Sequence, residues 1–144
     1  MITMSFSHVG LVCRDPLVTE RYYAKHFGFR RVRVYAPGPD QVVLIKAPDG
    51  VALELFKATE GAPCPPPKEA GPNWPCLRHL CFSVSSVDEK LREMGSEGRV
   101  TLGPLDMSAF IPGMRVCWVA DPDGNIVELN QGYVDDPNPP PLAP

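Results

Sequence analysis

The alternation of apolar and polar residues predicts two closely similar hairpins in this chain. One is A-P-D-G-V-A-L-E-L at residues 47–55, and the other is A-D-P-D-G-N-I-V-E-L at residues 120–129. Asp-Gly between two apolar runs is a strong hairpin signal, because a type I′ turn needs positive φ and glycine adopts it without steric cost. A glutamate follows each glycine by four residues, so we expect Glu54 and Glu128 on the outgoing strands.

A second matching segment lies upstream of each hairpin. Residues 7–13 read S-H-V-G-L-V-C and residues 78–84 read R-H-L-C-F-S-V, so His8 or His79 opens each expected strand. The chain is therefore interpreted as two copies of one module, roughly seventy residues long. Each copy supplies one histidine and one glutamate.

Local signals predict one helix after the first strand of each module. Asp15 is a typical N-cap, Pro16 suits the first helical position, and Gly28 marks the end of the first helix. Ser86 and Glu89 form a capping box at the start of the second helix. Each module then continues with three more strands, which gives the order β-α-β-β-β. The expected strands are 5–13, 29–35, 41–47 and 51–57 in the first module, and one from 78, 99–102, 115–120 and 125–131 in the second, with 104–113 as a loop.

The two modules are separated by a proline-rich segment. Module one covers residues 5–57, module two covers residues 78–132, and the linker at 58–77 contains six prolines. Such a composition resists helix and strand pairing, so we expect the linker to lie across the surface or to cover something. The tail at 133–144 is again rich in proline and is expected to be poorly ordered. The predicted fold class is α+β, a single domain over 1–144 whose two β-α-β-β-β modules form a curved mixed sheet around a shared cleft.

Composition narrows the class of protein. The hydrophobic content of 44% is enough for a compact core, and a formal charge of -3 gives no electrostatic reason to expect nucleic acid or an anionic membrane as a partner. No apolar run reaches the length of a membrane span, and the first residues show no targeting signal. The five cysteines are odd in number and lack C-x-x-C spacing. We therefore expect free thiols and a cytoplasmic location.

His8, Glu54, His79 and Glu128 together form a ligand set suited to a divalent transition metal ion. Two carboxylates cancel the charge of the ion, and four protein ligands on an octahedral ion leave two positions for water or substrate oxygens. A lone histidine or glutamate on a strand is more often structural. Recurrence at matching places in both modules favours the metal site. His26 has no such match in the second module, and we interpret it as structural.

The paired modules with these four residues, closed by D-P-D-G-N-I-V-E-L, resemble the vicinal oxygen chelate superfamily over nearly the whole chain apart from linker and tail. That superfamily includes glyoxalase I, methylmalonyl-CoA epimerase, fosfomycin-resistance thiol transferases, extradiol dioxygenases and metal-free bleomycin-resistance proteins. The order His, Glu, His, Glu resembles bacterial glyoxalase I, the lactoylglutathione lyase.

The resemblance implies one divalent metal ion per site, with Ni, Co, Zn, Mn and Fe all open, and a small vicinally oxygenated substrate. It implies that a glutamate of the site moves a proton between neighbouring carbons through an enediolate, with Glu128 as the first candidate for the base and Glu54 as the second. It also implies a homodimer, and it leaves open whether the ligands come from one chain or two. Val12 and Ala58 stand where glyoxalase I has the arginine and asparagine that hold glutathione, so the resemblance leaves open whether glutathione is used.

Two alternatives from the same superfamily stay open. An extradiol dioxygenase needs two histidines and one glutamate on Fe(II), so Glu54 would be a surplus ligand. A ligand-sequestering resistance protein needs no metal, which would leave all four residues without a role.

Further substrate contacts are expected from strand alternation and from one loop. Phe56 shares a face with Glu54, Asn130 shares one with Glu128, and Cys81 lies on the strand face of His79. Met107 and Phe110 lie on a loop that could close over a ligand. Arg115 is the nearest candidate to bind an anionic group of the substrate.

Overall fold

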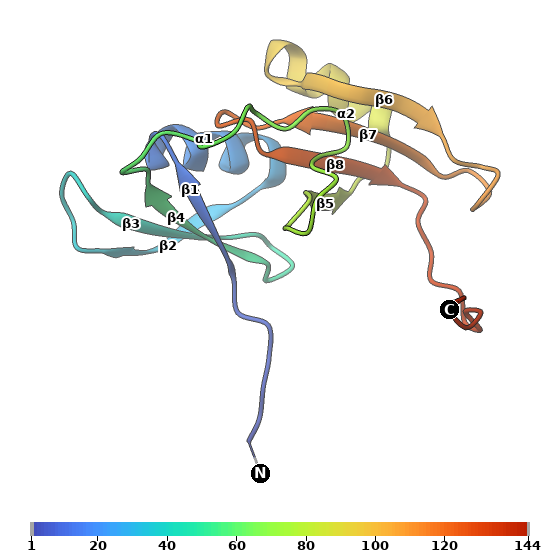
Figure 1. The fold of residues 1–144 in the computed structure, drawn as a ribbon, viewed down its shortest axis with the longest axis horizontal. Coiled ribbons are helices and arrows are strands. Elements are labelled where there is room, and N and C mark those ends of the chain that lie inside the picture. Colours follow the sequence, from blue (N-terminus) through green and yellow to red (C-terminus); the bar gives the residue numbers. More distant parts are fainter. Residues whose placement is uncertain (1, 144) are drawn as a thin grey trace. The chain divides into compact units, whose positions relative to one another are not determined.

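The computed structural model describes residues 2–143 and contains two four-stranded mixed sheets, one from each module (Figure 1). Met1 and Pro144 lie outside the described residues. In chain order the elements are β1 (Val9–Cys13), α1 (Pro16–Phe27), β2 (Arg30–Tyr35), β3 (Val42–Lys46), β4 (Ala52–Lys57), β5 (Leu80–Ser83), α2 (Val87–Met94), a 3-10 turn η1 (Gly95–Glu97), β6 (Arg99–Asp106), β7 (Arg115–Ala120) and β8 (Ile126–Gln131).

The chain divides into two compact units. The first comprises the residues up to Pro66 together with Asp121–Asn125, and the second comprises Pro67–Ala120 and the residues from Ile126 onward. The division falls inside the predicted linker. The turn Asp121–Asn125 is encoded in the second module but belongs to the first unit.

The first sheet has the strand order β1-β4-β3-β2, with β1 parallel to β4 and the other pairs antiparallel. α1 contacts β3 and β4 on one face, and the side chains of that face are apolar and fully buried, as at Leu53, Leu55 and Ile45. Glu54, between two of these residues, projects from the opposite face because strand side chains alternate.

The second sheet repeats this arrangement in the order β5-β8-β7-β6, with β5 parallel to β8. α2 contacts β7 and β8, over the buried side chains of Val119, Val127 and Leu129. The duplicated β-α-β-β-β module predicted from the sequence is confirmed.

The predicted helix caps are also present. The Asp15 carboxylate accepts a hydrogen bond from the Leu17 amide at 2.9 Å, and Gly28 ends α1 in the left-handed region at φ 70°. The Ser86 hydroxyl accepts a hydrogen bond from the Glu89 amide at 3.2 Å. These signals are local in sequence, and so they were readable without the fold.

The two Asp-Gly hairpins form, but the predicted turn type was wrong. Each is a three-residue loop, Pro48–Gly50 or Pro122–Gly124, in which the amide of the last residue donates to the carbonyl three positions earlier at 3.0 Å. The glycines have φ of 96° and 89°. A type I′ turn needs positive φ at both central residues, and the proline ring fixes φ near −65°. In each loop the last residue, Gly50 or Gly124, is therefore the one that adopts positive φ.

Two strand boundaries differ from the sequence prediction by more than two residues. The strand expected from residue 5 begins only at Val9, and the loop expected at 104–113 begins later because β6 continues to Asp106. The register of β6 against β7 shifts between Leu102 and Leu105. This irregularity accommodates Pro104, which has no amide to donate, on an edge strand where proline is tolerated.

The second half of the linker covers part of the second sheet. This was one of the two arrangements expected from the sequence. Ala70 joins a buried apolar cluster with Val116, Trp118 and Ile126. The Glu69 carbonyl accepts a hydrogen bond from the Thr101 hydroxyl at 2.6 Å. These contacts hold the linker against β6, β7 and β8.

The turn Asp121–Asn125 is anchored to α1 by two carboxylates, of which that of Asp121 is buried. Asp121 is fully buried, and one of its oxygens accepts a hydrogen bond from the Tyr23 hydroxyl at 3.0 Å. Asp123 accepts hydrogen bonds from the Thr19 hydroxyl and the Arg14 amide, each at 2.8 Å. Burial raises the pKa of Asp121 above its ordinary value, and hydrogen bonds from Asn125 oppose that rise.

All five cysteines are free, as predicted. Burial raises the pKa of the Cys13 and Cys117 thiols to about 11. His26 is buried on α1, with its ring centroid 4.9 Å from that of Tyr22, in keeping with a structural role. Within residues 2–143, no helix has the length and apolar character needed to cross a bilayer.

Candidate functional site

The first unit brings His8 and Glu54 together. His8 directly precedes β1, and Glu54 lies in the middle of β4, where its Cα pairs with that of Gly10. Two residues along a strand restore the same face, so His8 and Glu54 project together. The distance from His8 Nε2 to Glu54 Oε2 is 3.1 Å.

The second unit builds the same pair from His79 and Glu128. His79 directly precedes β5, and the Cα of Glu128 pairs with that of Cys81 in β5. The distance from His79 Nε2 to Glu128 Oε2 is 3.0 Å. The four residues singled out in the sequence thus form two equivalent pairs, one in each unit.

The tautomer of His79 is fixed by the linker. Its Nδ1 lies 2.8 Å from the carbonyl oxygen of Ala70, and a carbonyl only accepts, so Nδ1 carries a proton. A neutral ring then directs the lone pair of Nε2 at the Glu128 carboxylate, which is also an acceptor. Two acceptors at this distance repel each other unless a cation, either a second proton or a metal ion, stands at Nε2.

The donor spacing of both pairs fits metal ligation. Two donors about 2.1 Å from one ion and at right angles to each other lie about 3.0 Å apart, and the two pairs have separations of 3.1 and 3.0 Å. The same spacing also suits a charged hydrogen bond. Among residues 2–143, no group of three or more His, Cys, Asp or Glu side chains is arranged to hold an ion. Each pair by itself offers two donors.

The second pair has polar neighbours. Asn130, which is 7% exposed, donates a hydrogen bond from Nδ2 to Glu128 Oε1 at 2.9 Å. Cys81 is exposed as a residue, yet partial desolvation of its thiol, followed by the charge of Glu128 and a hydrogen bond to it, raises its pKa to about 12. The indole of Trp118 meets the His79 ring edge to face, with centroids 6.3 Å apart. In the described structure, Trp118 Nε1 and Asn130 Oδ1 are buried without hydrogen-bond partners.

The first pair has apolar neighbours at the corresponding register positions. Leu44 lies opposite Glu54 where Trp118 lies opposite Glu128. Phe56 is two residues after Glu54, and a Cβ placed on Gly10 would lie 3.7 Å from its ring. The prediction that Phe56 shares a face with Glu54 agrees with the strand alternation.

The other predicted substrate contacts are placed differently. Met107 packs against the Ala70 cluster, and Phe110 is 79% exposed on its loop. Arg115 does not accompany Glu128. It lies on the face of β7 that α2 covers, and its guanidinium donates to Asp88 at 3.0 Å, because an odd offset from Trp118 turns it to that face.

Sequence analysis did not identify Ala70 or Trp118 as neighbours of His79. Trp118 could have been found by counting register outward from the closing hairpin, which places it opposite Glu128. Nothing in the sequence indicates the contact of Ala70 with His79. Every residue has a carbonyl group, and the position of this one depends on the path of the linker.

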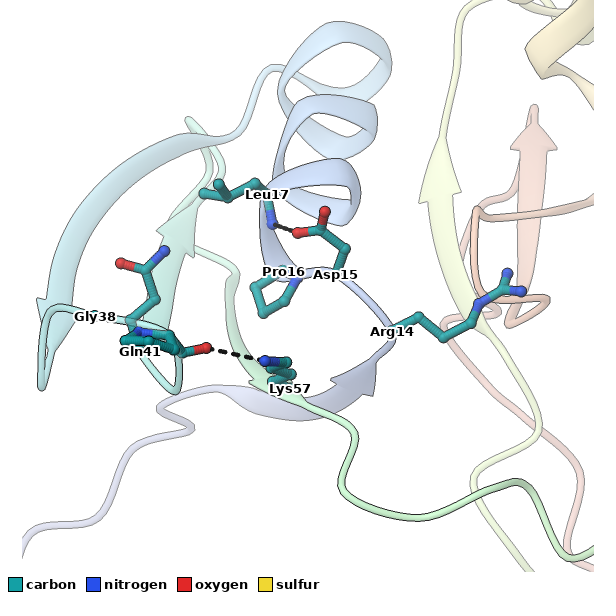
Figure 2. Close-up of a pocket in the computed structure, with 8 residues that line it drawn as sticks. Arg14, Asp15, Pro16, Leu17, Gly38, Gln41 and Lys57 are labelled. Carbon is teal, nitrogen blue, oxygen red and sulfur yellow. Dashed lines mark hydrogen bonds between the residues drawn. The ribbon is translucent and has the colours of Figure 1, made fainter.

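A separate pocket of about 370 Å³ lies in the first unit at the start of α1 (Figure 2). Lys57 Nζ donates there to the carbonyl of Pro39 at 3.3 Å, and the Arg14 side chain points away, toward the turn that contains Asp123. The pocket contains none of the four candidate ligands.

Comparisons with known proteins give one family. The family model described as Glyoxalase/Bleomycin resistance protein/Dioxygenase superfamily matches residues 5–129. The YwkD protein of Bacillus subtilis (strain 168) is 28% identical over 131 residues, which cover 90% of this chain and 98% of YwkD. The crystal structure of a glyoxalase family protein from Enterococcus faecalis is 25% identical with a TM-score of 0.67, covering 91% of this chain and 100% of that chain.

A fold likeness extends to FosX, the genomically encoded fosfomycin resistance protein of Listeria monocytogenes. Its crystal structure with Mn(II) and sulfate aligns with a TM-score of 0.63 at 15% identity, covering 92% of this chain and 96% of FosX.

Proposed function

Because this chain belongs to the glyoxalase/bleomycin resistance protein/dioxygenase superfamily, we propose that it is a divalent-metal-dependent isomerase or lyase of the glyoxalase I type. It acts on a small vicinally oxygenated substrate. His8, Glu54, His79 and Glu128 together hold one metal ion, each unit supplying one of the two pairs. The duplicated geometry of the pairs supports this ligand set.

The observation that carries the proposal is the orientation of His79. Its Nδ1 proton is committed to the Ala70 carbonyl, and its Nε2 faces the carboxylate of Glu128. Metal-ligating histidines commonly donate their other ring nitrogen to a backbone carbonyl in this way, which fixes the ring and keeps the ligating nitrogen deprotonated. The Mn(II) in the structure of FosX supports a metal on this fold.

The bound ion supplies Lewis acidity, which stabilises negative charge developing on substrate oxygens. The residues of the chain supply the rest. His8 and His79 contribute neutral nitrogen donors, and the two carboxylates balance the charge of the ion. One carboxylate also accepts a proton from a substrate carbon and returns it to the neighbouring carbon. Glutathione is not assigned as a cosubstrate, because Val12 and Ala58 offer it no charged or amide side chain.

We extend the proposal to a cytoplasmic homodimer. Free thiols suit a reducing compartment. In the first unit, Phe6, Val12 and Phe56 are exposed apolar side chains, at 77%, 64% and 37%, and this surface is available to a second copy.

The test is metal content. Elemental analysis of protein purified without chelator or affinity tag is expected to give about one Ni, Co, Zn or Mn per four-ligand site. His79→Ala should abolish both metal binding and turnover, because it removes the donor that the linker orients. Glu60→Gln, at an exposed linker position, is the matched control and should change neither. Turnover is assayed with methylglyoxal and several thiols.

Other outcomes would contradict the proposal in defined ways. Iron, with ring cleavage of catechols, would indicate an extradiol dioxygenase. Absence of metal after reconstitution, with a folded His79→Ala variant that still binds ligand, would indicate a sequestering protein.

A further inference from the structure

The two metal half-sites are built on one template, yet they differ around the carboxylate. At each register position the second unit has a polar or larger side chain where the first has an apolar or smaller one. The second unit has Asn130 where the first has Phe56, Cys81 where it has Gly10, and Trp118 where it has Leu44. The difference therefore concerns how each glutamate is held, because the strand geometry is shared.

Glu128 is held at both carboxylate oxygens. Asn130 Nδ2 donates to Oε1 at 2.9 Å, and His79 Nε2 lies 3.0 Å from Oε2. Asn130 is itself 7% exposed, and its backbone carbonyl accepts from the Val84 amide at 2.8 Å, which fixes its position beside the end of β5. A buried amide on a paired strand has little freedom to turn away.

Glu54 is held at one oxygen only. His8 Nε2 lies 3.1 Å from its Oε2, and no side chain among the described residues donates to its Oε1. Phe56, in the place of Asn130, has no hydrogen-bond donor. The side chain of Glu54 is also more exposed than that of Glu128, 19% against 12%. Glu54 can therefore rotate toward a substrate without breaking a second hydrogen bond.

We propose that Asn130 is a positioning residue that fixes Glu128 as the constant metal ligand and leaves Glu54 as the base. This assignment rests on the proposed function, and it reverses the order of preference taken from the sequence. Hydrogen bonds that orient a ligating carboxylate strengthen metal binding, whereas a base needs a carboxylate that can leave the ion and reach the substrate.

The chemical step is a balanced proton transfer. A Glu54 carboxylate oxygen takes the proton from a substrate carbon next to a carbonyl, and the C–H electron pair stays on the substrate as a carbon–carbon double bond forms. The same carboxyl returns the proton to the neighbouring carbon, the former carbonyl carbon, and the electron pair of the double bond forms the new C–H bond. The hydroxyl proton of the first carbon moves to the oxygen of the second, so a carbonyl is left on the first carbon and a hydroxyl on the second. Glu54 ends as it began, and neither an oxidant nor a reductant is needed.

The experiment measures metal affinity and turnover separately, with Zn²⁺ or Ni²⁺ alone as the probe in competition with a chromophoric chelator. Glu128→Gln and Asn130→Leu are expected to weaken metal binding by about 10- to 100-fold, the usual effect of losing a ligand or its orienting partner. Glu54→Gln is expected to weaken metal binding less than Glu128→Gln, and to lose solvent-deuterium incorporation into the substrate when metal is saturating.

The reciprocal change is made at an exposed position, where folding is at low risk. Phe56→Asn places an amide beside Glu54, and it is expected to tighten metal binding and to slow turnover. Phe56→Leu, which removes the ring but adds no donor, is the matched comparison and should not tighten metal binding. Thermal unfolding of each variant shows whether it is folded.

The outcomes distinguish the inference from the function beneath it. If Glu54→Gln and Glu128→Gln weaken metal binding equally and Phe56→Asn changes nothing, Asn130 has no positioning role and the inference is wrong, while the metal site stands. If Glu128→Gln retains deuterium incorporation lost in Glu54→Gln, the inference is supported. If the wild-type protein binds no metal, both the inference and the proposed function are wrong.

Discussion

Among single residues, Gly71 has the strictest backbone requirement near the second pair. Its φ is 112°, and a Cβ at this position would lie 2.4 Å from the carbonyl oxygen of Arg78. Both constraints exclude any other residue without a shift of the backbone. Because Gly71 follows Ala70 directly, its turn also sets where the carbonyl that orients His79 lies.

Gly71→Ala is therefore expected to affect both stability and the metal site. We expect the free energy of unfolding to fall by about 1–3 kcal/mol, as for other strained backbone positions, and Zn²⁺ affinity to fall as the Ala70 carbonyl moves away from His79. Urea unfolding and metal titration measure the two effects. Gly61→Ala is the control, since nothing lies within 4 Å of a Cβ there, and equal effects from both substitutions would contradict this account.

The sequence predicted the residues of the two His–Glu pairs better than their surroundings. His8, Glu54, His79 and Glu128 were identified because recurrence in two modules is visible in one dimension, and each pair then follows from strand register. The hydrogen bond of Asn130 was not predicted, although its shared face with Glu128 was. Whether an amide reaches a carboxylate depends on side-chain rotamers that the packing decides.

At the scale of elements, the buried turn on α1 introduces a pH-dependent contribution to stability. Asp121 is surrounded by donors, yet burial is the largest influence on its carboxyl and keeps its pKa above the ordinary 3.8. The folded protein consequently binds this proton more readily than the unfolded chain does. Its contribution to stability is complete below pH 3.8 and is lost as the pH rises through the raised pKa.

Asp121→Asn should remove this pH dependence. Asparagine keeps an acceptor for the amides of the turn and carries no charge at any pH. Relative to wild type, the variant is expected to gain stability as the pH rises from 3.8 through the raised pKa of Asp121, because other carboxyl groups contribute equally to both proteins and cancel. Urea unfolding across that range measures the difference, and a constant difference would show that Asp121 does not titrate there.

Elements themselves were predicted where their signals are local. The caps at Asp15 and Ser86 and the closing glycines gave helices and hairpins in the correct order. The exact form of the turns was missed, because Pro48 and Pro122 override the usual preference of Asp-Gly. The extent of β6 was missed because Pro104 in a sequence indicates a loop unless an edge strand accommodates it.

For the whole molecule, the proposed metal ion should add to the stability of the folded state. A ligand that binds only the folded state stabilises it by mass action, by about 2.7 kcal/mol when its concentration is one hundred times its dissociation constant. Adding Zn²⁺ or Ni²⁺ to metal-free protein is therefore expected to raise the unfolding temperature, and a chelator should reverse the rise. His79→Ala should show no rise, and an equal rise in that variant would mean that the metal binds elsewhere.

The turn Asp121–Asn125 gives the duplication an unusual history. A repeat that arose by copying one gene segment begins as a self-sufficient piece, able to fold from its own residues. Here the first half uses five residues encoded far downstream, since the hydroxyl groups of Tyr23 and Thr19 donate to carboxylates of that turn. Division of the gene at the linker would separate those hydroxyl groups from their carboxylate partners. The first copy thus relies on residues encoded in the second.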